Sequence, residues 1–317
     1  MFEAFQIGPF LFRSYVLFLL LGIILATELF LRIVRKENLR IAVFYRKGMW
    51  FISLFLLIGR LFAILILYRV YVQDPLRILI FWDGEFSIVG GCIGIAIALF
   101  IATYRERQTF LTWLDAMLPP MTLLFAFDWF GRFLGALSYG KPTNMPWGVI
   151  YESMQVRYTV PVHPVQIYYA FWFSIVTFLL LLLHKKRFDQ MPRFEGSSGV
   201  GFPTLLGVFL GCLGVVLLEY FRGDFALTVF AKLTDFLFLT LLFVSLGVIA
   251  VLERRISPRF SLMNSIAVGF GTIGYLLLRP FITVASIEWR FSQFIAVLAM
   301  IAAIVYVCAY RFKYRNL

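Results

Sequence analysis

Cysteine, histidine and acidic residues are scarce in this sequence of 317 residues, which has three cysteines, two histidines and 17 aspartates and glutamates. The cysteines Cys92, Cys212 and Cys308 each lie inside an apolar run. Such cysteines are typical small core residues, so they predict neither a disulfide framework nor a metal site. We expect no metal and no cofactor. Ser/Pro-rich linkers and low-complexity tracts are also missing, which excludes a flexible linker between modules.

Apolar residues, by contrast, make up 62% of the chain, and the mean hydropathy is +0.89. A soluble domain is about 45–50% apolar. The excess gathers into runs of about twenty residues, which is the length that crosses a hydrocarbon core of about 30 Å. In lipid each backbone amide must pair within its own segment, so these runs predict helices. Residues 175–183 show none of the alternation of a membrane barrel. The sequence therefore predicts an all-α, polytopic membrane protein.

About nine transmembrane helices are expected. The predicted spans are residues 14–33, 49–67, 86–102, 110–130, 164–183, 200–218, 229–252, 264–283 and 291–310. The fourth span is unusual because Pro119 and Pro120 interrupt it and Asp115 and Asp128 lie within it. Such a helix persists in lipid where other parts of the protein satisfy the freed backbone groups. The first span has no small-residue cleavage site, so we expect it to be retained.

The net charge is +12, which in a soluble protein would suggest nucleic acid as a partner. Here the basic residues cluster at the ends of apolar runs, which indicates contact with lipid headgroups instead. Eighteen of them follow the odd-numbered spans or end the chain, and ten lie on the other side. The richer side should be cytoplasmic. We expect the N-terminus outside and the C-terminus in the cytoplasm, and no nucleic-acid partner.

Ionisable groups at membrane depth are costly and mark a functional site or a buried partner. Arg60 lies in the middle of the second span, Asp128 and Arg132 are four residues apart, and Glu219 and Arg222 are three apart. One interpretation is that these acids and arginines neutralise one another and fix the packing of the helices. The other is a cationic cavity, open to the outer leaflet, that holds a lipid phosphate. On this second interpretation we expect Arg60, Arg132 and Arg222 to converge.

The two histidines lie at opposite ends of the fifth span. His163 precedes Pro164 and is followed by Gln166 and Tyr168. A neutral imidazole there can act as a general base or as a hydrogen-bond donor to phosphate, or it can simply be a satisfied polar cap. His184 begins a basic cytoplasmic stretch, and we expect it to face headgroups.

Several short segments form a further pattern when they are taken in chain order. They are Ile7-Gly8-Pro9 with Tyr15, Gly59-Arg60-Leu61, residues 74–94 with Trp82 and the pair Gly90-Gly91, Tyr-Gly-Lys-Pro-Thr-Asn-Met-Pro-Trp-Gly at 139–148, His163-Pro-Val-Gln-Ile-Tyr168, and Glu219-Tyr-Phe-Arg222 with Asp224. This ordered set resembles the prolipoprotein diacylglyceryl transferase family to about residue 252. Each segment alone is a weak signal, and their common order makes the resemblance specific.

The resemblance implies transfer of diacylglyceryl from phosphatidylglycerol to the lipobox cysteine of a prolipoprotein at the outer face of a bacterial inner (plasma) membrane. It implies catalytic roles for Tyr15, His163 and Glu219. The residues that it implies for lipid or phosphate binding are Arg60, Arg132, Gly140, Gln166, Tyr168 and Arg222. It also divides the chain into a family-like membrane domain at 1–252 and two additional transmembrane helices at 253–317.

Several polar positions of the family pattern are replaced. Val89 replaces a histidine of the family pattern, Val215 replaces an arginine and Tyr169 replaces a glutamate. The asparagines and the glutamate that the pattern has before Tyr139 are absent. Arg132 keeps the arginine of that segment, although an alignment without gaps puts Trp129 there instead. Residues that act as one unit fail together. We therefore expect weakened or lost catalysis with retained binding of an anionic, phosphatidylglycerol-like phospholipid.

Two alternatives remain open. The chain can be a catalytically silent structural or assembly subunit, whose partners are other membrane proteins and whose additional helices supply the interface. It can also be a transporter of a lipid-like substrate, which the polar groups of the fourth span would permit.

Overall fold

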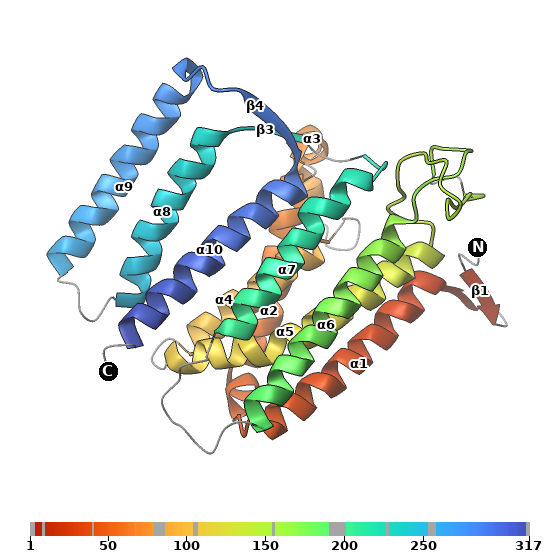
Figure 1. Cartoon of the computed structure of the whole chain (residues 1–317), viewed down its shortest axis with the longest axis horizontal. Helices are drawn as coiled ribbons and strands as arrows, with labels where there is room; N and C mark the ends of the chain where they lie inside the picture. Colours follow the sequence, from red (N-terminus) through yellow and green to blue (C-terminus); the bar gives the residue numbers. More distant parts are fainter. Residues whose placement is uncertain are drawn as a thin grey trace.

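The computed structural model describes residues 4–7, 10–39, 41–66, 68–78, 86–103, 107–153, 156–189, 201–225, 228–252 and 258–314. Long helices dominate it (Figure 1). They are α1 (Ser14–Lys36), α2 (Ala42–Ile66), α4 (Ile88–Ala102), α5 (Arg107–Leu134), α6 (Val165–Asp189), α7 (Phe202–Leu218), α8 (Leu233–Leu252), α9 (Pro258–Leu278) and α10 (Phe291–Tyr314). The short helices are α3 (Tyr68–Gln73), η1 (Pro75–Ile78), η2 (Glu219–Phe221) and η3 (Arg279–Phe281).

Each predicted span overlaps one of the long helices. Within the described residues, seven helices are long and apolar enough to cross a membrane, and the apolar stretches Gly90–Ala102 and Leu233–Ser245 are shorter. The prediction of an all-α, multi-span membrane protein is confirmed. The N-terminus and the loop between α5 and α6 lie at one end of the molecule, and the C-terminus lies at the other (Figure 1).

One predicted span begins in the wrong place. The seventh was expected to start at residue 229, but Thr228–Lys232 forms strand β3, and α8 begins only at Leu233. β3 pairs antiparallel with β4 (Ser286–Arg290), which directly precedes α10. The β-branched and aromatic residues of β3 suit a strand, and in the sequence they read as a continuation of the apolar run. A second short hairpin, β1 (Ala4–Ile7) with β2 (Phe10–Arg13), precedes α1.

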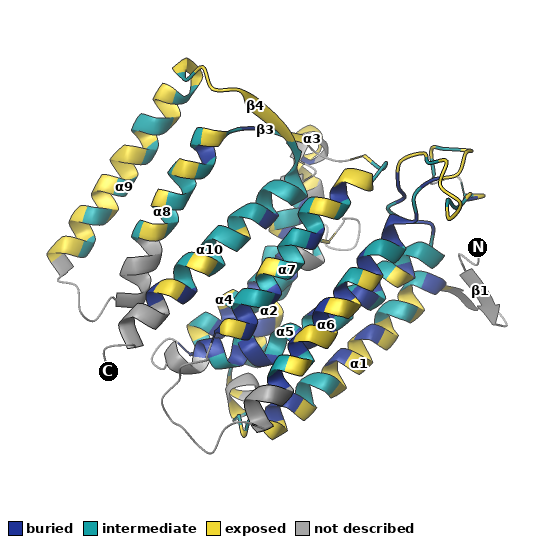
Figure 2. Ribbon diagram, viewed as in Figure 1, coloured by how far each residue is buried: buried dark blue, intermediate teal, exposed yellow. Residues whose placement is uncertain are grey.

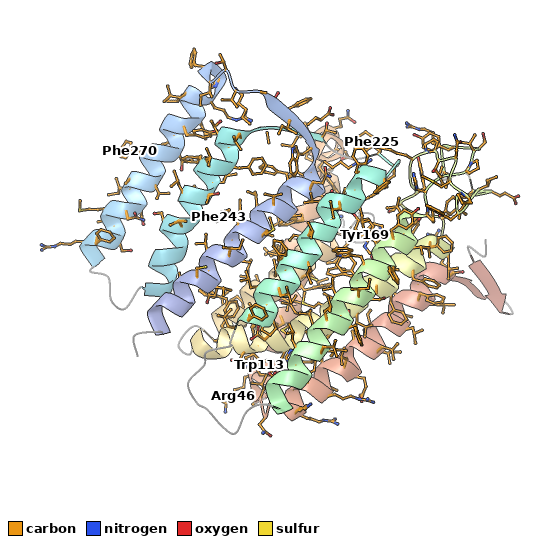
Figure 3. All side chains as sticks on the ribbon, in the orientation of Figure 1. Arg46, Trp113, Tyr169, Phe225, Phe243 and Phe270 are labelled. Carbon is orange, nitrogen blue, oxygen red and sulfur yellow. The ribbon has the colours of Figure 1, made fainter. Side chains whose placement is uncertain are left out.

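The helices form a packed group with one loosely attached edge. α5 packs against α1 and α6, α2 packs against α4, and α10 packs against both α7 and α8. Trp113 and Tyr169 lie between these helices (Figure 3), and each is at most 1% exposed. At the edge, α9 packs beside α8 and is largely exposed along its length (Figure 2). The division of the chain at residue 252 stays a prediction.

The proline pair in α5 is accommodated by contacts with neighbouring helices. Pro119 has no N–H to donate to the carbonyl of Asp115 four residues earlier. His184 of α6 supplies that donor, since its Nε2 lies 2.9 Å from the Asp115 carbonyl oxygen. The expectation that His184 faces headgroups is therefore wrong: it is 4% exposed, and its Nδ1 lies 3.0 Å from a carboxylate oxygen of Glu37. A backbone carbonyl freed inside the membrane requires such a partner.

The side chain of Asp115 holds the beginning of α7. Its carboxylate accepts hydrogen bonds from the backbone N–H of Gly201 (2.8 Å) and of Thr204 (2.9 Å), and from the Thr204 hydroxyl. Gly201 has φ of +85°, a conformation that favours glycine. A carboxylate from α5 thus caps the N-terminus of α7, where the helix dipole favours negative charge.

Candidate functional site

The loop between α5 and α6 meets the chain segment that follows α7. Gly140 forms an isolated antiparallel bridge with Arg222. Beside the bridge, the Lys141 N–H donates to the Phe221 carbonyl at 2.8 Å, and the Gly223 N–H donates to the Tyr139 carbonyl at 3.0 Å. A Cβ at Gly140 would lie 2.2 Å from the carbonyl oxygen of His163, so only glycine fits there. This close pairing fixes the backbone of Arg222 at the end of the helix bundle where the α5–α6 loop lies.

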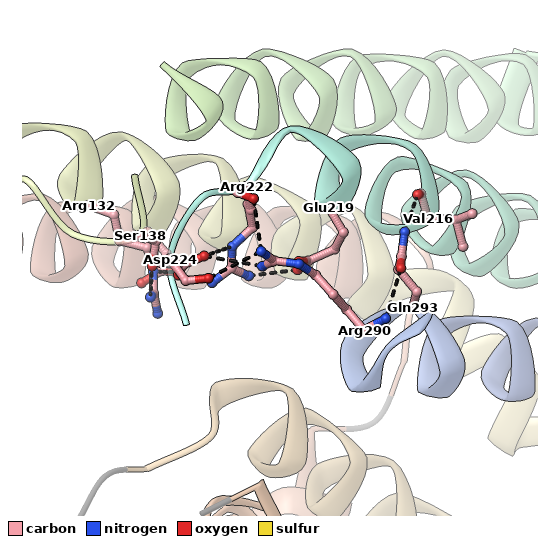
Figure 4. Close-up of polar contacts among 9 residues, drawn as sticks. Arg132, Ser138, Val216, Glu219, Arg222, Asp224, Arg290 and Gln293 are labelled. Atoms are coloured by element: carbon pink, nitrogen blue, oxygen red, sulfur yellow. Dashed lines mark hydrogen bonds and ion pairs between the residues drawn. The ribbon is translucent and has the colours of Figure 1, made fainter. Parts of the chain in front are cut away.

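Arg222 lies in a cluster of four charged side chains (Figure 4). Its guanidinium donates to Glu219 at 2.6 Å and to both carboxylate oxygens of Asp224. Arg290, at the junction of β4 and α10, contacts Glu219 at 3.3 Å and Asp224 at 3.2 Å, and donates to the Arg222 carbonyl at 2.8 Å. Burial by itself lowers the pKa of Arg222, but the charges of Glu219 and Asp224 outweigh burial and hold this pKa above its usual range.

Arg132 lies on the last turn of α5 in a second cluster. Its Nε donates to Asp128 at 2.9 Å, and its Nη1 donates to the Ser138 hydroxyl at 3.3 Å. The other oxygen of Asp128 accepts a hydrogen bond from the Tyr15 hydroxyl of α1, also at 2.9 Å. The spacing of Asp128 and Arg132 predicted their shared helix face, and the structure adds Tyr15 to the pair.

Trp129 brings the two clusters together. The guanidinium carbons of Arg132 and Arg222 lie 5.3 Å and 5.6 Å from the centroid of its ring, both within cation–π range. The ring also stacks on Tyr169, with centroids 4.0 Å apart. Two of the three arginines that the sequence singled out thus converge on one aromatic side chain, although each is also paired with an acid.

Arg60 lies in a different environment. It is 4% exposed on α2, and its guanidinium carbon is 5.2 Å from the ring of Tyr71 on α3. These helices differ from those that position Arg132 and Arg222. The lipid-binding role predicted for Arg60 stays a prediction.

His163 and Tyr168 lie in an aromatic cluster beside Gly140. The Nδ1 of His163 is 3.2 Å from the Tyr168 hydroxyl, which also accepts a hydrogen bond from Trp147 at 2.7 Å. The imidazole packs against Phe221, with ring centroids 5.2 Å apart. Burial lowers the pKa of His163. The ring is therefore mostly neutral at pH 7.

Gln166 is a buried connector between loop and helix. Its Nε2 donates to the Leu137 carbonyl at 2.7 Å, and its Oε1 accepts a hydrogen bond from Tyr151 at 3.2 Å. Burial raises the pKa of Tyr151 to about 12, so this phenol stays protonated and can donate. Gln166 thus holds the loop that carries Tyr139 and Gly140.

Sequence reasoning missed two residues of the site, Arg290 and Gln293. The Gln293 side chain accepts a hydrogen bond from the Arg290 N–H at 3.0 Å and donates to the Val216 carbonyl of α7 at 2.8 Å. A glutamine three residues inside a helix start that bonds back to the backbone is half of a capping box, a weak signal in sequence. In the predicted outer loop, Trp82, Asp83, Gly84 and Glu85 lie outside the described residues, as does the side chain of Val89.

Comparison of the sequence with known proteins relates this chain to one family. The family model of prolipoprotein diacylglyceryl transferase matches residues 3–253. A phosphatidylglycerol–prolipoprotein diacylglyceryl transferase of Clostridium tetani is 32% identical over 140 residues, which are 44% of this chain and 52% of that protein. The protein of the same name from Pseudomonas fluorescens is 29% identical over 128 residues, 40% of this chain and 46% of that protein.

The aligned regions are shorter than the family match. The chain spans about half the length of the curated relatives it matches. The family match, however, extends from β1 through α8 and contains Trp129, Arg132 and the Glu219–Arg222–Asp224 cluster. This chain belongs to the prolipoprotein diacylglyceryl transferase family.

Proposed function

We propose that this protein binds the phosphate of a phosphatidylglycerol-like phospholipid beside Trp129, and that it performs diacylglyceryl transfer weakly or not at all. The observation that carries the proposal is the convergence of Arg132 and Arg222 on the Trp129 ring, at 5.3 Å and 5.6 Å. A planar guanidinium suits bidentate binding of a phosphate. The names of the curated relatives support phosphatidylglycerol as the lipid class.

We expect weak diacylglyceryl transfer because the side chains proposed as catalytic groups are engaged in contacts with other side chains. A thiol with a pKa near 8.5 is only a few per cent thiolate at neutral pH, so transfer to a cysteine needs a base or a polar network nearby. The Tyr15 hydroxyl is bonded to Asp128, and Glu219 is paired with two arginines. His163 packs against Tyr168 and Phe221. Each proposed acid or base is thus held by other side chains.

A silent structural or assembly subunit is the second candidate. The observation that favours it is the exposure of α9, whose Phe270 and Leu277 are 73% and 68% exposed. Phe270 points away from the other helices (Figure 3). Both lipid and a partner helix suit such a face.

Lipid retention after purification tests the proposed binding. The wild-type protein should keep phosphatidylglycerol in preference to phosphatidylcholine when it is taken from membranes that contain both, as measured by native mass spectrometry. Arg132→Gln should reduce this preference by about tenfold or more, because a charge-assisted hydrogen bond contributes about 1.5–3 kcal/mol. Arg157→Gln removes the same charge from an exposed loop position and serves as the control. Equal retention of the two lipids by the wild-type protein would contradict the proposal.

A further inference from the structure

Asp224 lies between two arginines from distant parts of the chain. It receives two hydrogen bonds from the Arg222 guanidinium, and its Oδ1 lies 3.2 Å from Nη1 of Arg290 (Figure 4). The carboxylate of Asp224 therefore occupies the planar, bidentate position that a guanidinium also offers to a phosphate. Arg290 lies beyond residue 253, where the family match ends.

The two acids of this cluster differ in exposure. The side chain of Glu219 is 3% exposed, within η2 at the end of α7, whereas that of Asp224 is 18% exposed. Asp224 is followed by Phe225, which is 84% exposed. Asp224 is thus the acid that an incoming anion reaches first.

The charge balance of this cluster favours the replacement of the Asp224 carboxylate by a phosphodiester over the addition of a phosphodiester to the four groups. Glu219 and Asp224 carry two negative charges, and Arg222 and Arg290 carry two positive charges, so the cluster is neutral. A phosphodiester added to it would leave one excess negative charge in a poorly solvated place, which is costly. If the phosphodiester replaces the carboxylate of Asp224, the cluster stays neutral and both guanidinium groups keep an oxyanion.

We propose that Asp224 is an internal substitute for phosphate, and that Arg222 and Arg290 form a two-arginine clamp. A phosphodiester oxyanion, from a lipid headgroup or from a soluble molecule, exchanges with the Asp224 carboxylate. In its lipid form the proposal rests on the function proposed above. On this proposal the C-terminal segment contributes directly to phosphate binding, since that segment supplies Arg290.

Several backbone contacts hold Arg290 in its position. Its backbone is paired with Thr228 through β3 and β4 and bonded to Gln293, which in turn holds the Val216 carbonyl of α7. Its Nη2 donates to the carbonyls of Arg222 and Asp224 at 2.8 Å and 3.2 Å. These backbone contacts do not depend on the Asp224 carboxylate, so the clamp keeps its shape when the carboxylate leaves.

The test compares the affinity of the whole chain for two probes, soluble short-chain phosphatidylglycerol and glycerophosphoglycerol, which is the same phosphodiester without acyl chains. Asp224→Asn removes the competing charge and should tighten binding about tenfold, the effect of one charge-assisted contact. Arg290→Lys keeps the charge but loses the planar fork and should weaken binding. Glu288→Gln, an exposed acid of β4, and Arg157→Gln are the matched controls. Thermal melting of each variant checks that it is folded.

The two probes separate this inference from the proposed function. Tighter binding of the lipid by Asp224→Asn, with no change in Glu288→Gln, supports both. If the wild-type protein binds the lipid and Asp224→Asn binds it equally or less well, the clamp is wrong and the proposed function stands. Tighter binding of glycerophosphoglycerol without binding of the lipid supports the clamp and contradicts the proposed function. Binding of neither probe by any variant overturns both.

Discussion

Gly140 shows how much of the site depends on single residues. Its predicted role in lipid binding stays a prediction, and the structure adds a steric role, because any side chain would meet the His163 carbonyl. The same backbone position bridges to Arg222. The identity of Arg222 was readable from the sequence. Its partner Arg290 was not, because the pair is joined by tertiary packing across 68 residues.

We expect Gly140→Ala to lower the free energy of unfolding by about 1–3 kcal/mol, the usual cost of forcing an extra methyl group into a packed region. It should also disturb the Arg222 backbone and weaken lipid retention. Gly269→Ala is the matched control, since a Cβ at Gly269 meets nothing within 4 Å. Thermal melting of the two purified variants measures the loss of stability, and native mass spectrometry measures the lipid that each retains. Equal melting temperatures for the two variants would contradict the close packing at Gly140.

At the scale of elements, the apolar runs predicted the helices well because backbone pairing in lipid leaves few alternatives. The strand β3 was missed because its central residues, 229–231, are apolar and lead directly into the apolar helix that follows, and its partner β4 lies more than 50 residues later. The sequence also indicated that other parts of the protein must satisfy the backbone groups that the prolines of α5 leave unpaired. It did not indicate that the donor would be His184, which is 69 residues from Asp115.

The cap on α7 is open to a direct test. Asp115→Ala removes the acceptor of two backbone N–H groups and of the Thr204 hydroxyl. Leaving such buried donors unsatisfied costs about 1–3 kcal/mol, so the variant should melt at a lower temperature. Thr204→Val removes only the hydroxyl and should have a smaller effect. A larger loss in Thr204→Val than in Asp115→Ala would show that the backbone contacts are not the main contribution of Asp115.

At the scale of the whole molecule, the positions of the basic residues predict which side each loop faces. Reporter fusions after Arg187 and after Arg315 should both report the cytoplasm, because the basic-rich ends of the spans stay inside. A fusion in the α5–α6 loop, after Arg157, should report the outside. An external signal at Arg315 would mean that α9 and α10 do not both cross the membrane.

The central claim is that the family scaffold binds an anionic phospholipid with little or no transfer. The most direct measurement is to express this protein in bacterial cells depleted of their own diacylglyceryl transferase, and to follow growth and lipidated lipoprotein. We predict no rescue, with the protein present in the membrane and phosphatidylglycerol retained on it. Clear rescue that His163→Ala or Tyr15→Phe abolishes would contradict the account, because it would show that these residues still form a working active site.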